Sequence, residues 1–267
     1  MTTYTRDPFT LDVSQTSGIP FARLTAVELR KTYDTRASFW LLATIAFGVL
    51  LAETIALIVT ATQDTTIQFG DYTAVAAFLT SVLLPVLGIM LVTTEWTQRS
   101  AMVTFTLESR RSRVVLAKLV VGLLLTVATV VFAIVVGALC TVLSDALVGR
   151  SDWHFGADGF WGFFITQNLA MLIGFALAAL LLNTAAAIVL FFVYRFVLPT
   201  LFAIGSQLID WFADVAPWLD FGAAQQELFD LSAMTGEDWA HLLVSGFVWL
   251  VVPTVIGLRR ILRAEVK

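Results

Sequence analysis

The sequence predicts an all-α integral membrane protein with six transmembrane helices. Of its 267 residues, 58% are hydrophobic and only 13% are charged, and the mean hydropathy is +0.87. A soluble domain needs a far more charged surface than this composition can supply. Several apolar runs exceed about eighteen residues, which is the length that crosses a bilayer as a helix, whereas the strands of a membrane barrel are about half as long.

Cysteine and histidine are too scarce to indicate a cofactor site. Cys140 is the single cysteine and lies in an apolar run, so an internal disulfide is excluded. The chain has only two histidines, His154 and His241, which disfavours a metal site built from imidazoles. We therefore expect this chain to bind neither a metal nor a cofactor.

The chain begins with a polar tail and an amphipathic segment. Residues 1–19 are rich in Thr, Ser and Asp and show no periodicity, which indicates a mobile tail. From about residue 20 to residue 36, Phe21, Leu24 and Val27 form one strip of a helix, and arginines form another. This pattern predicts an interfacial helix along the inner membrane surface.

Six apolar runs follow, and each predicts one transmembrane helix. Their ranges are about 38–61, 72–94, 115–143, 161–182, 185–204 and 240–258. Asn183 and Thr184 predict a tight turn between the fourth and fifth spans, and Pro85 lies inside the second span. We expect residues 20–267 to form a single domain.

The two signs of charge are divided between the two sides of the predicted membrane. Fourteen of the sixteen Lys and Arg residues fall in the N-terminal segment, the 95–118 stretch and the C-terminal tail. Twelve of the twenty acidic residues fall in the three loops on the opposite side. Because positive charge marks the inner face, both termini are predicted to be cytoplasmic and the protein to be a multi-pass protein of the plasma membrane.

The most basic stretch, residues 95–118, joins the second and third spans. Its apolar middle, from Ala101 to Leu107, is too short to cross a bilayer but can form about two helical turns, with Met102 over Phe105. Glu95 and Arg99 have the spacing of an ion pair on one helix face. The stretch therefore predicts a short cytoplasmic coupling helix that a partner contacts, with an ordinary basic loop as the alternative.

The segment between the fifth and sixth spans mixes aromatic and acidic residues. It runs from Gly205 to Trp239, with a helical spacing that starts at Leu208 and that Pro217 is expected to break, and a second short helix is expected after Gly222. It is too polar to span and too apolar to lie in water, so we expect it to dip into the outer leaflet as a partly re-entrant segment. Its role is either a lid over the bundle or an outer gate. The candidate gate residues are Trp211, Phe212, Trp218 and Phe221.

Two ionisable side chains, Glu53 and Arg195, lie well inside predicted spans. An ion-coupled secondary transporter uses such intramembrane charges. Such transporters often contain internal repeats, and none is visible between the two halves of this chain. The structural alternative is an ion pair between helices or two side chains that extend to the interface.

Together these features resemble the permease subunits of ABC-2-type exporters. The residues that match the loop pattern of that family are Glu95, Trp96, Arg99, Thr106, Leu107, Arg111 and Lys118. Many relatives carry glycine where Ser100 stands and proline where Ser109 stands, so the local geometry of the loop is expected to differ. The resemblance implies that the pre-span helix and the first cytoplasmic loop dock an ATPase. The docking residues would be Glu28, Arg30, Glu95, Arg99, Met102, Phe105, Leu107, Arg110 and Arg111.

The chain itself has no phosphate-binding loop, because none of its three lysines follows a glycine. We therefore expect a transport subunit that is not an enzyme, with ATP and Mg bound by a separate cytoplasmic ABC ATPase subunit in two copies. A second permease copy or a related permease would complete the pathway, membrane lipids would surround it, and no nucleic acid is expected. The alternatives are the ion-coupled secondary transporter and a membrane-anchoring or assembly subunit. Apolar pathway linings suit lipids, peptides and drugs alike, so the sequence does not single out a substrate.

Overall fold

The computed structural model describes residues 18–63, 68–98, 100, 104, 106, 108, 110–149 and 152–263. Within these ranges all elements of regular secondary structure are helices, apart from one isolated β-bridge between Gln68 and Asp152. Six helical segments of the described residues are long and apolar enough to cross a membrane. They are Arg36–Gln63, Phe69–Thr97, Arg111–Val148, Ala157–Leu181, Thr184–Leu208 and Gly236–Arg263. The predicted all-helical class and the six spans are confirmed, and they indicate a multi-pass membrane protein.

The first four spans are single helices, and the last two are composite. A preceding helix, α1, covers Phe21–Asp34, and the first four spans are α2 (Arg36–Gln63), α3 (Phe69–Thr97), α5 (Arg111–Val148) and α6 (Ala157–Leu181). The fifth span consists of α7 (Thr184–Phe192), the π-helical η1 (Val193–Val197) and α8 (Leu198–Leu208). The connecting segment holds α9 (Asp210–Leu219), α10 (Phe221–Ala224) and the 3₁₀ helix η2 (Gln226–Asp230). The sixth span consists of α11 (Gly236–Gly246), the π-helical η3 (Phe247–Val251) and α12 (Val252–Arg263).

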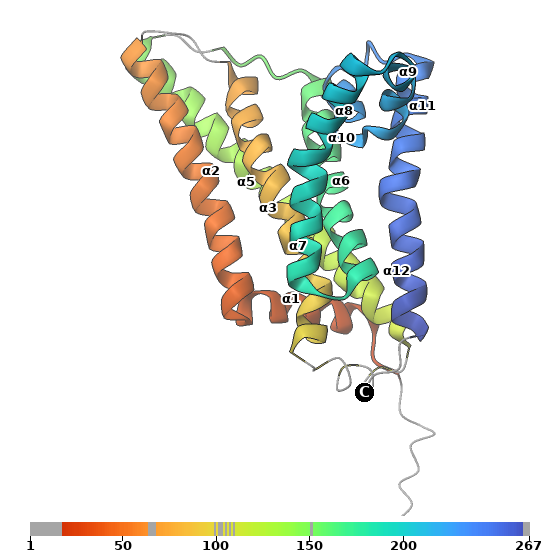
Figure 1. Ribbon diagram of the computed structural model, residues 1–267. Coiled ribbons are helices and arrows are strands. Elements are labelled where there is room, and N and C mark those ends of the chain that lie inside the picture. Colours follow the sequence, from red (N-terminus) through yellow and green to blue (C-terminus); the bar gives the residue numbers. More distant parts are fainter. Residues whose placement is uncertain are drawn as a thin grey trace, which may run out of the picture.

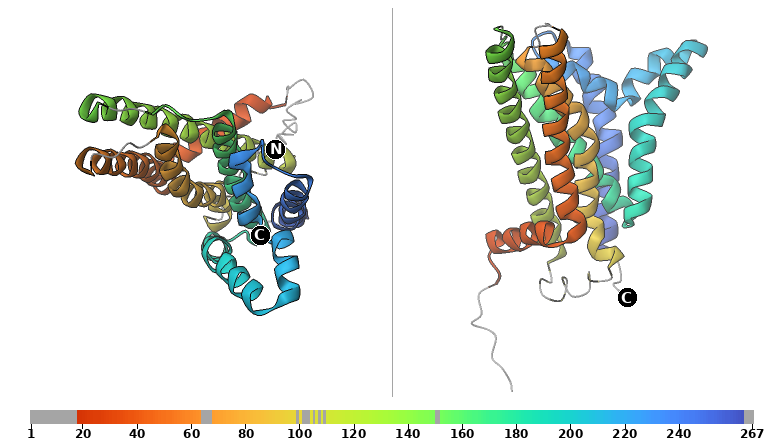
Figure 2. Two further views of the ribbon diagram at one scale, coloured as in Figure 1. Left: turned by 90° about the horizontal axis from the view of Figure 1, so that it is seen from above. Right: turned by 90° about the vertical axis from the view of Figure 1, so that its left-hand side faces the viewer.

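The spans run side by side, and the shorter helices lie at their two ends (Figure 1). α1 lies across the foot of the bundle, at the end where α12 also finishes, and we call this the α1 end. α9 and α10 gather at the opposite end, which we call the α9 end. The side view of Figure 2 shows α1 roughly perpendicular to the spans.

α3 and α6 form the centre of the bundle. About half of the apolar, membrane-spanning stretch of each helix is buried, 50% for α3 and 56% for α6, compared with 17% for α2 and 11% for the fifth span. Glycine allows this close approach: a Cβ on Gly88 would lie 2.6 Å from the carbonyl oxygen of Met171, and a Cβ on Gly174 would overlap the backbone of Pro85. The helices that surround this pair present large apolar side chains outward, as lipid-facing helices do.

The π turns of the last two spans each precede a proline. Pro199 and Pro253 have no backbone N–H for the carbonyl four residues earlier. In the turn before each proline the backbone bond spans five residues instead, from the N–H of Leu198 to Val193 and from the N–H of Val252 to Phe247. The helices thus continue past both prolines, and π turns of this kind are frequent at functional sites.

The turn between α6 and α7 and the helix that contains Pro217 were both predicted from the sequence. The predicted tight turn is present: Leu182 has a positive φ of 52°, and the side chain of Asn183 accepts a hydrogen bond of 3.0 Å from the N–H of Ala186. The expectation that Pro217 breaks its helix was wrong, because α9 continues to Leu219. Pro217 lies near the end of this short helix, where the N–H of Asp220 still bonds the carbonyl of Ala216 at 2.9 Å.

Candidate functional site

Two lysines and two glutamates form a closed charge ring at the α1 end, contributed by α1, α3 and α5. Lys31 Nζ donates to Glu28 Oε1 at 2.6 Å and to Glu95 Oε1 at 2.7 Å. Lys118 Nζ donates to Glu28 Oε2 at 2.7 Å and lies 3.3 Å from Glu95 Oε2. Each lysine thus bridges the same two carboxylates, and the four formal charges cancel.

Three of the four side chains in the charge ring are buried. The side chains of Glu28, Lys118 and Glu95 are 2%, 7% and 10% exposed, whereas that of Lys31 is 41% exposed. Buried charges remain stable only when they are paired and hydrogen-bonded, and here each carboxylate contacts both ammonium groups. Burial alone lowers the pKa of Lys31, but the bonds to Glu28 and Glu95 outweigh it, so this pKa is raised above its usual 10.5.

The segment between α3 and α5 is tied to the charge ring. Thr104 Oγ1 donates to Glu95 Oε1 at 3.0 Å, and the N–H of Ser100 donates to the carbonyl of Glu95 at 2.9 Å. A cavity of about 670 Å³ opens beside the ring, between α1 and the end of α3. Its lining includes Val27, Thr94 and Glu108 in addition to the ring residues.

Further polar contacts hold the start of α1 and the end of α12 against α5. Arg113 bonds Glu108 at 2.7 Å and donates to the carbonyl of Ile19 at 2.6 Å. Arg111 donates to the carbonyls of Ile261 and Leu262 of α12 at 3.1 and 3.4 Å. The α1 end is therefore a polar junction that joins α1, α3, α5 and α12, together with Ser100 and Thr104 of the segment between α3 and α5.

The nine predicted docking residues fall into three groups. Arg99, Met102, Phe105 and Leu107 lie outside the described residues. Glu28 and Glu95 belong to the charge ring and Arg111 contacts α12, so in this structure these three hold helices together. Arg30 and Arg110 are exposed, with Arg30 paired to Asp34 at 3.2 Å.

The two predicted intramembrane charges do not pair with each other. Glu53 on α2 is fully buried, and both of its carboxyl oxygens lack a hydrogen-bond partner in the described structure. Arg195 on η1 instead donates to Ser81 Oγ on α3 at 3.3 Å. The prediction of an interhelical ion pair between Glu53 and Arg195 is therefore wrong, because Arg195 contacts α3 and the carboxyl group of Glu53 contacts no cation among the described residues.

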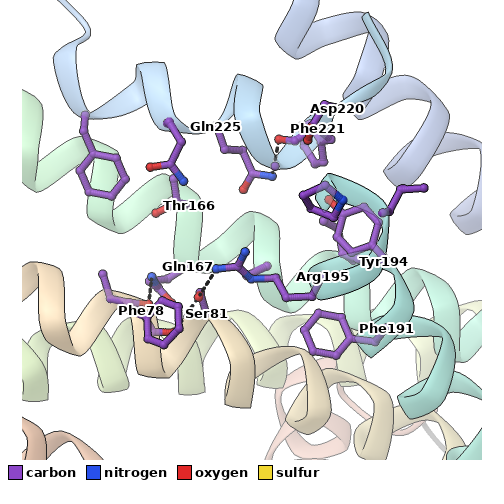
Figure 3. A pocket seen from close by; sticks show the side chains of 18 of the residues that line it. Phe78, Ser81, Thr166, Gln167, Phe191, Tyr194, Arg195, Asp220, Phe221 and Gln225 are labelled. Carbon is purple, nitrogen blue, oxygen red and sulfur yellow. Dashed lines mark hydrogen bonds between the residues drawn. The ribbon is translucent and has the colours of Figure 1, made fainter. Parts of the chain in front are cut away.

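Arg195 lines a second cavity, of about 310 Å³, which we call the chamber (Figure 3). The chamber lies among α3, α6, the fifth span and the segment from Asp220 to Phe229. Its polar lining residues are Ser81, Thr166, Gln167, Tyr194, Arg195, Asp220, Gln225 and Gln226. Figure 3 shows the guanidinium of Arg195 pointing across the chamber toward Ser81, with Gln167 beside it.

Arg195 lies deep in its span. It is eleven residues from Thr184, which corresponds to about 16 Å along a helix. A charge at such a depth costs about 3 kcal/mol or more in lipid unless protein groups compensate for the lost water. Besides Ser81, the rings of Phe78 and Phe196 lie 6.0 and 5.8 Å from the guanidinium carbon, which is the range of cation–π contacts.

The four candidate gate residues do not form one aromatic cluster. Phe221 is 2% exposed and lines the chamber, and Trp218 packs edge-on against His241 with ring centroids 4.5 Å apart. Phe212 contacts Phe202 at 5.8 Å, while Trp211 is 65% exposed. Of the four, Phe221 is thus the one placed beside a cavity.

Sequence reasoning missed Lys31 and Lys118 as ring members and Tyr194 and Gln167 as chamber residues. The sequence marked Lys118 as a topology signal and as part of the ABC-2-like loop pattern, but not as a buried partner of Glu28, although it lies in an otherwise apolar stretch of α5. Lys31 follows Glu28 by three residues, a spacing that places both on one helix face. No pattern in the sequence identifies Tyr194 or Gln167, because their importance depends on how three helices meet.

Comparison with known proteins finds no family model that matches the chain and no curated protein similar to it. The structure itself gives the class of the protein, which is all-helical with six helices long and apolar enough to cross a membrane, as in a multi-pass membrane protein.

Proposed function

We propose that this chain is the transmembrane permease subunit of an ATP-driven exporter of the ABC-2 type. The observation that carries the proposal is the charge ring, which attaches α1 and the loop after α3 to two spans at the same end of the bundle. An exporter without its own nucleotide site needs such an attachment, because the force of ATP-driven closure must reach the spans from outside them.

The contacts provide a direct mechanical route for that force. A partner that presses on α1 or on the loop acts, through Glu28 and Glu95, on α5 and α3. α3 in turn packs tightly against α6 at Gly88 and Gly174, and α6 lines the chamber. Movement at the α1 end thus reaches the centre of the bundle through the ion-paired side chains of the charge ring and the close packing of α3 on α6.

This proposal includes an orientation in the plasma membrane. The α1 end and both termini are cytoplasmic, α1 lies in the inner interface, and α9 to η2 dip into the outer leaflet. In a Cys140→Ala background, single cysteines at Asp71 and Glu227 should react with an impermeant thiol reagent applied outside. Cysteines at positions 110 and 263 should not react. If the cysteine at position 110 is labelled from outside, the proposed orientation is wrong.

The partner is a cytoplasmic ATPase with a phosphate-binding loop, present in two copies with two permeases. The test is to purify the tagged chain from its native membranes and to look for such an ATPase and for its ATP hydrolysis. Phe105→Asp should lose the ATPase while the permease remains inserted, since a charge placed in an apolar contact is costly. Thr2→Asp, in the N-terminal tail, should retain it. If the wild-type chain copurifies with no ATPase, the proposal fails.

A second candidate, an ion-coupled secondary transporter, is favoured by one observation. The carboxyl group of Glu53 is buried, and within the described ranges neither of its oxygens has a hydrogen-bond partner, as expected for a group that binds and releases a proton inside a membrane. This candidate predicts substrate movement driven by a pH gradient without ATP and abolished by Glu53→Gln. The permease proposal predicts that transport requires ATP and survives this substitution.

A further inference from the structure

In the part of the chain that the structure describes, the guanidinium of Arg195 has no acidic partner, although it lies deep in a span. Within the described residues no ion pair includes it, and its polar contact is the hydroxyl of Ser81. Asp220 lines the same chamber, but its Oδ1 accepts the N–H of Ala223 at 2.9 Å and caps α10. Asp220 keeps its negative charge in the same chamber, but the guanidinium of Arg195 is not ion-paired with it and can bind an anion that enters.

Two further polar atoms, from residues on two different helices that line the chamber, lack a hydrogen-bond partner among the described residues. Gln167 is 1% exposed, and its Nε2 donates to the carbonyl of Ala77 at 3.2 Å, while its Oε1 has no hydrogen-bond partner. The hydroxyl of Tyr194 is buried and likewise has no hydrogen-bond partner among the residues that the structure describes. Unsatisfied groups of this kind are rare in folded proteins, and here both belong to residues that line the chamber beside Arg195.

We propose that the chamber binds the head group of an anionic amphiphile, in which a phosphate or carboxylate group meets Arg195 and an alkyl stem lies against the apolar wall. Phosphate or carboxylate oxygens can accept from the guanidinium of Arg195, and guanidinium groups bind such anions in a fixed planar geometry. The apolar wall includes Ile173, Phe191 and Phe202.

The size of the chamber suits part of such a molecule. Its volume of about 310 Å³ is at the lower end of the range of ligand pockets, roughly 300–1,000 Å³. It accommodates a head group and the first carbons of a chain, while the rest of the chain extends toward lipid. Naming this amphiphile as the transported molecule rests on the proposed function, but its binding does not.

Binding is measured by calorimetry on the purified full chain in a neutral maltoside detergent, without any ATPase. Dodecyl phosphate and dodecanoate should bind saturably, and dodecyltrimethylammonium, with the same chain and the opposite charge, should not. Inorganic phosphate separates a free anion from an amphiphile and should bind at least tenfold more weakly than dodecyl phosphate. If inorganic phosphate binds as tightly as dodecyl phosphate, the proposal that the ligand is an amphiphile is wrong. If dodecyltrimethylammonium binds as tightly as dodecyl phosphate, the proposal that Arg195 selects an anion is wrong.

Variants locate the site in the chamber. Arg195→Gln should weaken dodecyl phosphate binding at least tenfold, and Arg195→Lys, which keeps the charge but loses the planar fork, should weaken it less. The matched control is Arg259→Gln, because Arg259 is exposed on α12 and does not line the chamber. Wild-type affinity in Arg195→Gln would overturn the proposal. The ligand series on the unmodified chain keeps it testable if this variant does not fold.

Discussion

Replacing Lys118 with methionine removes one of the two cations that the charge ring needs. The change keeps the length of the side chain but leaves the carboxylates of Glu28 and Glu95, 2% and 10% exposed, to share Lys31 alone. Removing one partner of a buried ion pair costs about 3–5 kcal/mol, because the other charge stays buried. At about 2–4 °C per kcal/mol for chains near this size, the melting temperature should fall by about 6–20 °C.

A double variant separates loss of charge balance from loss of packing. In Glu28→Gln/Lys118→Met the remaining pair, Lys31 and Glu95, is again neutral and still joined at 2.7 Å. The double variant should therefore cost less than the two single variants summed, with a coupling free energy of about 0.5–3 kcal/mol.

The control for this prediction is a solvent-exposed ion pair on α1, the helix that carries Glu28 and Lys31. Arg30 and Asp34 are 73% and 56% exposed, so Arg30→Met should cost at most about 0.5 kcal/mol. Melting is followed in neutral detergent by the loss of helical circular dichroism. If Lys118→Met melts no earlier than Arg30→Met, the charge ring does not stabilise the junction and the reasoning is wrong.

Three further predictions follow from single contacts. Gly174→Ala should destabilise by about 1–3 kcal/mol in the same melting assay, since its Cβ would overlap the backbone of Pro85, whereas Gly236→Ala, with open space around it, should have little effect. Glu53→Gln and Arg195→Gln should have additive effects on stability to within about 0.5 kcal/mol, and a larger coupling would mean that the two side chains do meet. Because the pKa of Lys31 is raised, its stabilising contribution is fully present below 10.5 and is lost only as the pH rises through the raised value. The difference in melting temperature between wild type and Lys31→Met should thus stay constant from about pH 7 to about pH 9.5, and a fall within this range would contradict it.

The spans could be predicted because a bilayer imposes a one-dimensional rule, namely a long run of apolar residues. The turn at Asn183 could be predicted for a similar reason, since a short polar side chain after an apolar run caps the next helix locally. Pro217 was misjudged because a missing hydrogen bond matters less near the end of a short helix, and the sequence does not state where that helix ends.

The polar sites could be predicted only in part, because they join residues that are distant in sequence. Lys31 meets Glu95 across 64 residues, and Lys118 meets Glu28 across 90. Local spacing suggested Arg99 as the partner of Glu95, and it carried no information on which faces of α1, α3 and α5 turn toward one another. Arg195 was recognised as an unusual intramembrane charge, but its chamber depends on the way η1 faces Ser81 and Gln167.

Site-specific cross-linking tests most directly whether an ATPase docks at the α1 end. A photoreactive residue is placed at Arg30 or at Arg110, which are exposed there, and at Glu227, which is exposed on η2 in the segment between the fifth and sixth spans. After irradiation of native membranes, Arg30 and Arg110 should each give a cross-link to a polypeptide with an ATP-binding loop, and Glu227 should give none. Cross-linking of that ATPase from Glu227, or its absence from both Arg30 and Arg110, would contradict the proposed permease function.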